Sequence, residues 1–276
     1  PLFRRSARTP TERISKLGRL TNTRMFRASQ SEDELKASLD AIGTLALESA
    51  SIRQDELTVV RRLGEGAFAT VDLCRLPAQH KAIRERESAG ERAGGEPGAL
   101  ADTTRLVAVK RMKPQVPGPI DHMTGEQKLV SVPVSWRLHF QAEAALLELL
   151  RHPNVVGCYG HVVTSDPREG DLMFVQEFCG GGTLLEQVRR RGYSVGEGLR
   201  WLTQIARGMA YLHANPSGVA IAHRDLKPEN ILLGDSAGEA RVAKVSDFGL
   251  FRVMSDGGSI RHGSDRASGG GGASGG

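Results

Sequence analysis

The chain has 276 residues, of which 39% are hydrophobic, 25% charged and only 5% aromatic, a composition that suits one large globular domain or two smaller lobes. No apolar run approaches the ~18 residues that a membrane-spanning helix needs, and the three widely spaced cysteines exclude a disulfide scaffold or a zinc ribbon. The net charge of +5 invites a nucleic-acid interpretation, but residues 1–30 alone carry +7, which leaves −2 for the rest of the chain. The basic character therefore belongs to an N-terminal arm, and we expect no nucleic-acid partner.

This arm is rich in Arg, Ser and Thr and poor in acids, which is typical of a targeting segment and also of a disordered arm with phosphorylatable serines. Behind it, apolar residues at near-helical spacing follow acidic residues over 31–50 and predict a short amphipathic helix. We therefore expect residues 1–50 to lie outside the folded domain. A cytoplasmic location is expected, with organelle targeting by the arm left open.

Short segments rich in Val and bounded by Gly or Pro predict five strands, at 57–63, 68–75, 106–112, 155–164 and 172–178. The polar stretches between them, at 77–104 and 113–133, are expected to be insertions, because long structureless loops are uncommon inside a compact domain.

Helices are predicted at 136–151, 182–191 and 196–214. The last has apolar residues at positions 199, 202, 205, 209 and 212, which predicts a buried helix. The final residues, 256–276, are dominated by Gly and Ser and are expected to form a disordered tail.

The first candidate for chemistry is the glycine-rich stretch LGEGAFATV (63–71), which lies between two predicted strands. Glycines allow a backbone to approach phosphates closely, but a plain tight turn is the better explanation of such a stretch when it stands alone. Because a strand and not a helix follows it, it differs from a dinucleotide-binding turn. It also lacks the Gly-Lys-Ser/Thr sequence of a phosphate loop.

A lysine and a glutamate form the second candidate. Alternation along the strand VAVK places Ala108 and Lys110 on one face, where a small residue beside a cation leaves room for a flat ring with phosphates. The alternative for Lys110 is an exposed edge-strand side chain. On the following helix, Glu143 and Glu148 are both candidates for its partner, and a solvated helix face is the alternative for each.

The most specific stretch is IAHRDLKPEN (221–230). It combines a carboxylate at Asp225, a cation at Lys227 and an amide at Asn230. Phosphoryl transfer needs these groups to orient the hydroxyl proton, to offset developing charge and to bind Mg²⁺. Asp247, in the sequence DFG, follows a short strand and offers a second oxygen ligand for a hard divalent ion.

In this order, these motifs resemble the eukaryotic protein kinase family from about Leu57 to Leu250. The resemblance implies an α+β, two-lobed protein kinase-like fold. Its N-lobe, at 57–178, would hold a five-stranded antiparallel sheet and one helix, and a mainly helical, incomplete C-lobe would follow at 179–255. It further implies ATP and Mg²⁺ as cofactors and serine/threonine side chains of proteins as substrates, similar to the tyrosine-kinase-like kinases of plants and algae.

The resemblance also implies a role for each site residue. The catalytic residues would be Asp225 as the base, supported by Lys227, and Lys110 on the phosphates, held by Glu143. Those that enclose ATP would be Leu63, Gly64, Gly66, Val71, Ala108, Glu177, Cys179 and Leu232, with Gln176 as the gatekeeper. Asn230 and Asp247 would bind Mg²⁺, and Leu147, His223 and Phe248 would stack into a hydrophobic spine.

The family's C-lobe continues past the DFG sequence, whereas 27 residues remain here after Gly249, without an Ala-Pro-Glu segment. We therefore expect the chain to be a fragment of a serine/threonine kinase. The alternative is a non-catalytic module that binds nucleotide or regulates a partner.

Overall fold

The computed structural model describes residues 51–88, 104–120, 122–164, 172–214, 220–234 and 241–254. The predicted N-terminal arm and amphipathic helix and the predicted Gly/Ser-rich tail lie outside these residues. So does most of the first predicted insertion.

The centre of the larger lobe is a six-stranded sheet with the order β1-β7-β8-β4-β3-β2. Its strands are β1 (Ser51–Arg53), β2 (Thr58–Glu65), β3 (Ala69–Pro77), β4 (Thr104–Met112), β7 (Cys158–Val163) and β8 (Met173–Glu177). Five of them pair antiparallel, which confirms the five predicted segments. The sequence prediction missed β1, which pairs parallel with β7 and buries Ile52 completely. Three residues are too few to show an alternating pattern.

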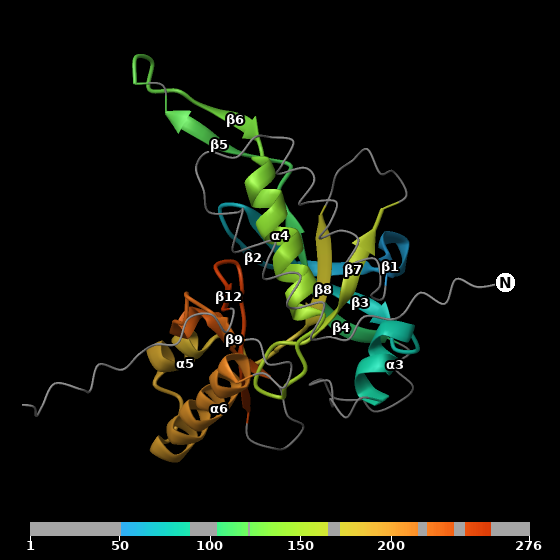
Figure 1. Ribbon diagram of the computed structural model, residues 1–276, viewed down its shortest axis with the longest axis vertical. Coiled ribbons are helices and arrows are strands. Elements are labelled where there is room, and N and C mark those ends of the chain that lie inside the picture. The colour runs from blue at the N-terminus through green and yellow to red at the C-terminus, as the bar shows by residue number, and fades with distance from the viewer. Residues whose placement is uncertain are drawn as a thin grey trace, which may run out of the picture.

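The two predicted insertions contain regular structure. The first begins with α3 (Lys81–Ser88), which follows β3 and buries Ala82 and Ile83 against the core beneath β1 and β7. The second folds into a hairpin of β5 (Gln115–Ile120) and β6 (Gln127–Ser131), which projects beyond the sheet at the top of Figure 1.

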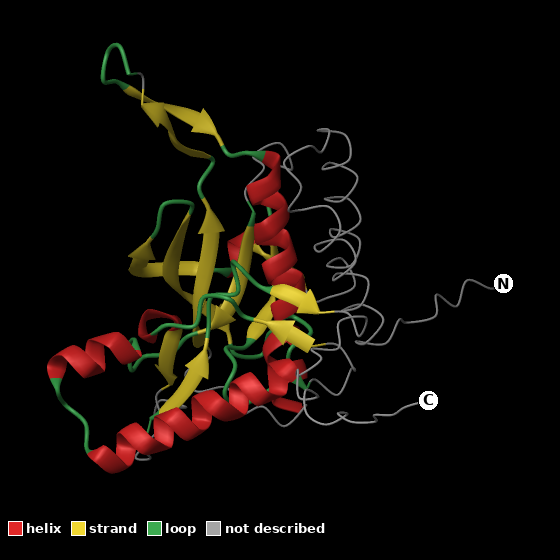
Figure 2. Cartoon of the chain, turned by 60° about the vertical axis from the view of Figure 1, so that its left-hand side comes forward, coloured by secondary structure: helices red, strands yellow, loops and turns green. Residues whose placement is uncertain are grey.

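Helix α4 (Val134–Leu147) runs along one face of the sheet, as Figures 1 and 2 show. Its inward side includes Leu138, Phe140 and Leu147, which join one continuous core with the strands of the second lobe. Because α4 packs on the sheet and touches this shared core, its position links the two lobes.

The second lobe begins with two capped helices, α5 (Leu184–Arg190) and α6 (Val195–His213). Each starts with a reciprocal capping box, Thr183 with Glu186 and Ser194 with Glu197, which satisfies free amide groups of the first turn. Short strands follow, β9 (Ala220–Ala222), β10 (Ile231–Gly234), β11 (Val242–Val245) and β12 (Arg252–Met254), with a 3₁₀ turn at Pro228–Asn230. Strand β10 pairs with β11 and β9 with β12, so the segments before and after the two motif loops lie side by side.

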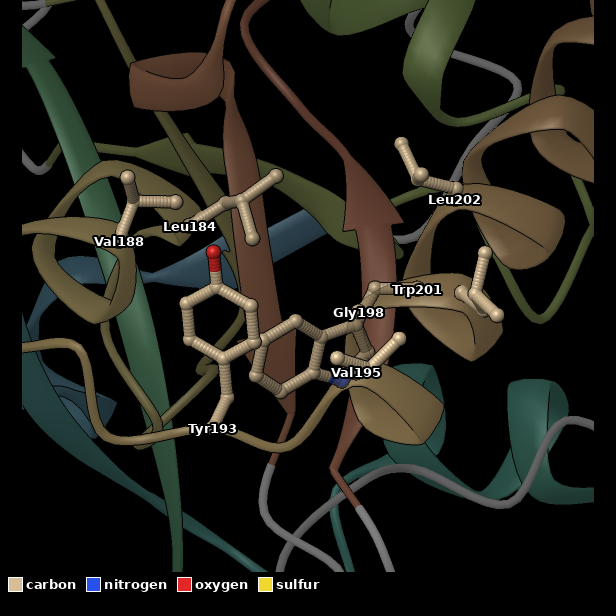
Figure 3. A pocket seen from close by; sticks show the side chains of 8 residues that line it. Leu184, Val188, Tyr193, Val195, Gly198, Trp201 and Leu202 are labelled. Carbon is tan, nitrogen blue, oxygen red and sulfur yellow. The ribbon is translucent and has the colours of Figure 1, made fainter.

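The prediction that α6 is buried all along its apolar side is wrong for its first half. Leu199 and Leu202 are 60% and 61% exposed, whereas Leu212 is fully buried. The exposed half forms an apolar groove with α5, centred on the neighbouring rings of Tyr193 and Trp201 (Figure 3). Periodicity predicts which face of a helix is apolar, but not whether another element covers that face.

Over the described ranges, none of the helices is long and apolar enough to cross a membrane.

Packing of α6 against the second lobe predicts the effect of one substitution. A Cβ atom at Gly208 would lie 2.5 Å from the carbonyl oxygen of Asn154 and 3.3 Å from a methyl group of Val245. Gly208→Ala should therefore lower the free energy of unfolding by about 1–3 kcal/mol in a denaturant titration. Gly196→Ala lies in the first turn of the same helix with only a side-chain oxygen 4.0 Å away, and it should be neutral or stabilising. Equal effects of the two substitutions would contradict this packing.

Candidate active site

The ammonium group of Lys110 joins three segments of the chain. Its Nζ atom lies 2.7 and 2.9 Å from the two carboxylate oxygens of Glu143 on α4. It also lies 3.2 Å from Oδ1 of Asp247, in the loop after β11. The structure thus brings together a strand, a helix and a loop whose charged residues were predicted to act as one site.

This ion cluster is largely withdrawn from water, since the side chains of Lys110 and Glu143 are 17% and 3% exposed. Burial by itself would favour neutral Lys110, but the charges of Glu143 and Asp247 outweigh it and raise the pKa of the lysine. Lys110 therefore stays cationic at neutral pH and can attract phosphate groups.

The choice between the two glutamates is decided by α4. Glu143 lies within the helix and faces Lys110, and the amide of Phe248 also bonds to it. Glu148 comes just after the helix ends and is buried on another side, where its Oε1 lies 3.7 Å from Nδ1 of His161. Glu143 is thus the glutamate that contacts Lys110.

The second charged group lies in the loop between β9 and the 3₁₀ turn. Lys227 donates to Oδ2 of Asp225 at 2.7 Å, and the Asn230 amide donates to the same oxygen at 2.9 Å. The bond from Lys227 lowers the pKa of Asp225, and that from Asn230 acts in the same direction. Asp225 is therefore ionised over the physiological pH range, and its other carboxylate oxygen remains available to a substrate.

Buried groups beneath this loop hold it in place. The His223 ring is 1% exposed, bonds through Nε2 to the carbonyl of Ser246 and accepts the Asp225 amide at Nδ1. Burial lowers the pKa of His223, so the ring is neutral. It packs 4.8 Å from the ring of Phe248, which shares the core with Leu147. The three residues of the expected spine thus lie in one buried region.

The glycine-rich loop is connected to Lys110 through the pairing of three neighbouring strands. Val71 pairs with Gly64 on one side and with Lys110 on the other. A Cβ atom at Gly64 would meet nothing within 4 Å, and neither Gly64 nor Gly66 has a positive φ. The fold does not require glycine at these positions, and a Cβ atom at Gly64 would project into open space.

The residues expected to enclose the ring of ATP come from both lobes. Ala108 lies two residues before Lys110 and pairs with Gln176 on β8. Leu63 is on β2, and Leu232 on β10 is bridged to Thr183. Glu177 ends β8, and Cys179 lies two residues further, in the segment 177–182, the hinge, which leads to α5.

Sequence reasoning missed one interaction in this region. The side chain of Glu177 is buried and lies 3.0 Å from Nζ of Lys244 on β11, and it accepts the amide of Gly157 at 3.2 Å. The sequence places Lys244 three residues before Asp247 but gives no signal that it pairs with Glu177, because the two residues are 67 positions apart.

The family model for protein tyrosine and serine/threonine kinases matches residues 57–268. The chain belongs to this protein kinase family. Curated relatives include serine/threonine-protein kinase 12 of Arabidopsis thaliana, which is 42% identical over 42% of this chain and 23% of its own length. Serine/threonine-protein kinase VIK of the same plant is 40% identical over 42% of this chain and 25% of that protein. The SNF1-like protein kinase ssp2 of Schizosaccharomyces pombe is 35% identical over 44% of this chain and 19% of its own length. The chain thus spans a quarter or less of the length of these relatives.

Membership of the kinase family raises the question of Mg²⁺. Within the described ranges there is no cluster of three or more His, Cys, Asp or Glu side chains that would hold a metal by itself. The Asp247 side chain is 48% exposed, and its Oδ1 contacts Lys110. The side-chain nitrogen of Asn230 donates to Asp225, so the side-chain oxygen of Asn230 is the atom that could bind a metal ion. One carboxylate and one amide oxygen fit an ion that takes its remaining oxygens from phosphates and water.

The bond between Lys227 and Asp225 predicts a change in proton affinity. In Lys227→Met the pKa of Asp225 should rise toward the ordinary value for aspartate, because the largest cause of its lowering is gone. An NMR titration of ¹³C-labelled aspartate carboxyl groups would measure the shift. Lys128→Met, on the projecting hairpin, is the matched control and should leave this pKa unchanged. An unchanged pKa in Lys227→Met would show that the 2.7 Å contact does not persist in solution.

Proposed function

We propose that this chain carries the nucleotide-binding and catalytic groups of an ATP- and Mg²⁺-dependent serine/threonine protein kinase. The observation that carries the proposal is the simultaneous contact of Lys110 with Glu143 and Asp247. A fixed, cationic ammonium group next to two carboxylates, in the same sheet as the glycine-rich turn, suits the binding of a nucleoside triphosphate.

The proposed reaction transfers the γ-phosphoryl group of ATP to a protein hydroxyl. The substrate oxygen forms a bond to the γ-phosphorus while the bond to the oxygen that bridges the β- and γ-phosphates breaks, and ADP leaves. Asp225 orients the hydroxyl and accepts its proton. A lowered pKa makes Asp225 a weak base in the ground state, so its main contribution is orientation until the hydroxyl proton becomes acidic.

The neighbouring cations share the charge that develops on the phosphoryl oxygens. Lys227 is 46% exposed and paired with Asp225, which places an ammonium group beside the position of the reacting hydroxyl. Mg²⁺, held by Asp247 and Asn230, would neutralise the phosphate charges when bound. Lys227, which resembles the residue of serine/threonine kinases at this place in the motif, and the similarity to serine/threonine-protein kinases both favour serine and threonine over tyrosine as acceptors.

The second candidate is a module that binds nucleotide but does not transfer phosphate. It is favoured by the exposed apolar groove between α5 and α6, because a large exposed apolar surface is typical of a protein-interaction site. The two candidates differ in phosphoryl transfer and agree in nucleotide binding.

The rate of phosphoryl transfer tests the role of Asp225. With radiolabelled MgATP and a generic Ser/Thr protein substrate, Asp225→Asn should reduce the rate by about 10²–10⁴-fold, the range typical of a lost general base. Asp55→Asn, whose side chain is 71% exposed, is the control and should retain the rate of the unmodified chain. Transfer by Asp225→Asn at the original rate would contradict this assignment.

Nucleotide binding tests the role of Lys110. MgATP should raise the melting temperature of the unmodified chain, and Lys110→Met should abolish this rise, because the ammonium group that meets the phosphates is lost. Lys128→Met should keep it. A rise without any transfer would favour the binding module, and an equal rise in Lys110→Met would contradict the proposed phosphate contact.

A further inference from the structure

A buried arginine links the first insertion to the segment behind the hinge. Arg86, on the last described turn of α3, is 5% exposed. Its Nη1 donates to the carbonyl of Cys158 at 2.5 Å and its Nη2 to the carbonyl of Leu150 at 3.5 Å. Leu150 lies in the stretch that joins α4 to β7, and Cys158 is the first residue of β7, so the insertion helix is bonded to the backbone of the larger lobe.

The helix that carries Arg86 is firmly packed. Ala82 and Ile83, one turn earlier, are 2% and 0% exposed, and they lie in the same core as Ile52 and Tyr159. Such packing fixes the direction from which the guanidinium group enters the protein. In Figure 1, α3 lies at the lower end of the sheet, and it contacts strand β7.

The guanidinium group lies directly on Gly157. A Cβ atom at this glycine would be 3.0–3.2 Å from three atoms of the Arg86 guanidinium group, and no other neighbour comes closer. The φ angle of Gly157 is not positive. The close approach of Arg86, and not the backbone conformation, is therefore what limits the size of this residue.

Gly157 in turn holds the first residue of the hinge. Its carbonyl accepts the Glu177 amide at 2.8 Å, and its own amide donates to Oε2 of Glu177 at 3.2 Å. On its other side Glu177 pairs with Val107 of β4, which lies three residues before Lys110 on the same strand. Arg86 thus supports the edge of the hinge that faces away from β4.

The same glutamate reaches the second lobe. Glu177 and Lys244 form an ion pair at 3.0 Å, and their side chains are only 6% and 10% exposed. A buried pair of this kind depends on exact placement of both groups, since each loses its hydration. The contacts therefore run from α3 through Gly157 and Glu177 to the strand that leads to Asp247.

We infer that Arg86 is a positioning residue for the nucleotide, which braces the hinge so that its backbone groups at Glu177 and Cys179 meet the edge of the adenine ring. This inference rests on the proposed function, because it assigns the hinge to the adenine and Lys110 to the phosphates. In this inference the insertion helix α3 helps to hold the nucleotide site in position.

Separate ligands for the adenine side and the phosphate side of ATP distinguish this positioning role from a merely structural one. If Arg86 acts through the hinge, its loss weakens the binding of ligands that contain adenine and leaves the binding of ligands that contain only phosphates unchanged. If it only holds the fold together, its loss lowers the melting temperature and leaves the affinities of the folded protein unchanged, or weakens all ligands equally.

The experiment measures the dissociation constants of MgATP, adenosine and magnesium tripolyphosphate by calorimetry. Arg86→Met should raise the dissociation constants of MgATP and adenosine by a common factor of about tenfold, the effect of one lost charge-assisted hydrogen bond. It should leave the dissociation constant of magnesium tripolyphosphate unchanged. Lys81→Met, on the exposed side of the same helix, is the matched control and should change none of the three.

A second set of variants covers the case in which Arg86→Met does not fold. Arg86→Lys keeps the charge but loses the planar fork and should give the same selective weakening to a smaller degree. Gly157→Ala displaces the guanidinium group without altering Arg86, and in combination with Arg86→Met it should weaken adenosine no further than either substitution alone.

The outcomes distinguish the inference from the function on which it rests. If the unmodified chain binds none of the three ligands, the proposed function fails. If it binds MgATP and the folded Arg86 variants bind MgATP and adenosine equally well, the inference is overturned and the proposed function stands. Equal weakening of tripolyphosphate would also overturn the inference.

Discussion

The ammonium group of Lys110 lies where a strand of the sheet, helix α4 and the loop after β11 meet, and the rest of the site depends on this meeting. A carboxylate as buried as Glu143 is stable only next to a cation. The pair therefore fixes α4 against the sheet, and through Asp247 it fixes the loop of the second lobe. The electrostatic requirement of one buried carboxylate thus sets the relative position of three segments that are far apart in the chain.

A second set of contacts lies behind the hinge and has a different character. In the cluster around Lys110 the Asp247 side chain is 48% exposed, whereas Glu177, Lys244 and Arg86 are almost completely covered by protein. Buried charges are costly unless their partners are held in place, so such a group resists movement of the hinge. The site therefore combines buried charged contacts behind the hinge with carboxylates at Asp225 and Asp247 that are partly open to solvent.

Much of the larger lobe could be predicted because its signals are local. Short Val-rich runs bounded by Gly and Pro identified the five antiparallel strands, and the motif around Asp225 contained its own partners at Lys227 and Asn230. Strand β1 was missed because three residues are too few to show the alternation of apolar and polar side chains that indicates a strand. The exposure of Leu199 was missed because periodicity gives the apolar face of a helix but not its neighbour.

The groups that we propose for the site can be recognised in the sequence alone: a glycine turn, a lysine on a small-residue face, and carboxylate, amide and ammonium groups in one loop, each within a few neighbouring positions. The structure places Glu143, the partner that the family resemblance implied, on Lys110. That Lys244 meets Glu177 and that Arg86 lies on Gly157 became visible only in the folded chain. These two contacts join residues separated by 67 and 71 positions, for which the sequence gives no signal. They are selected by burial, because a charge removed from water must find a partner wherever the folded chain provides one.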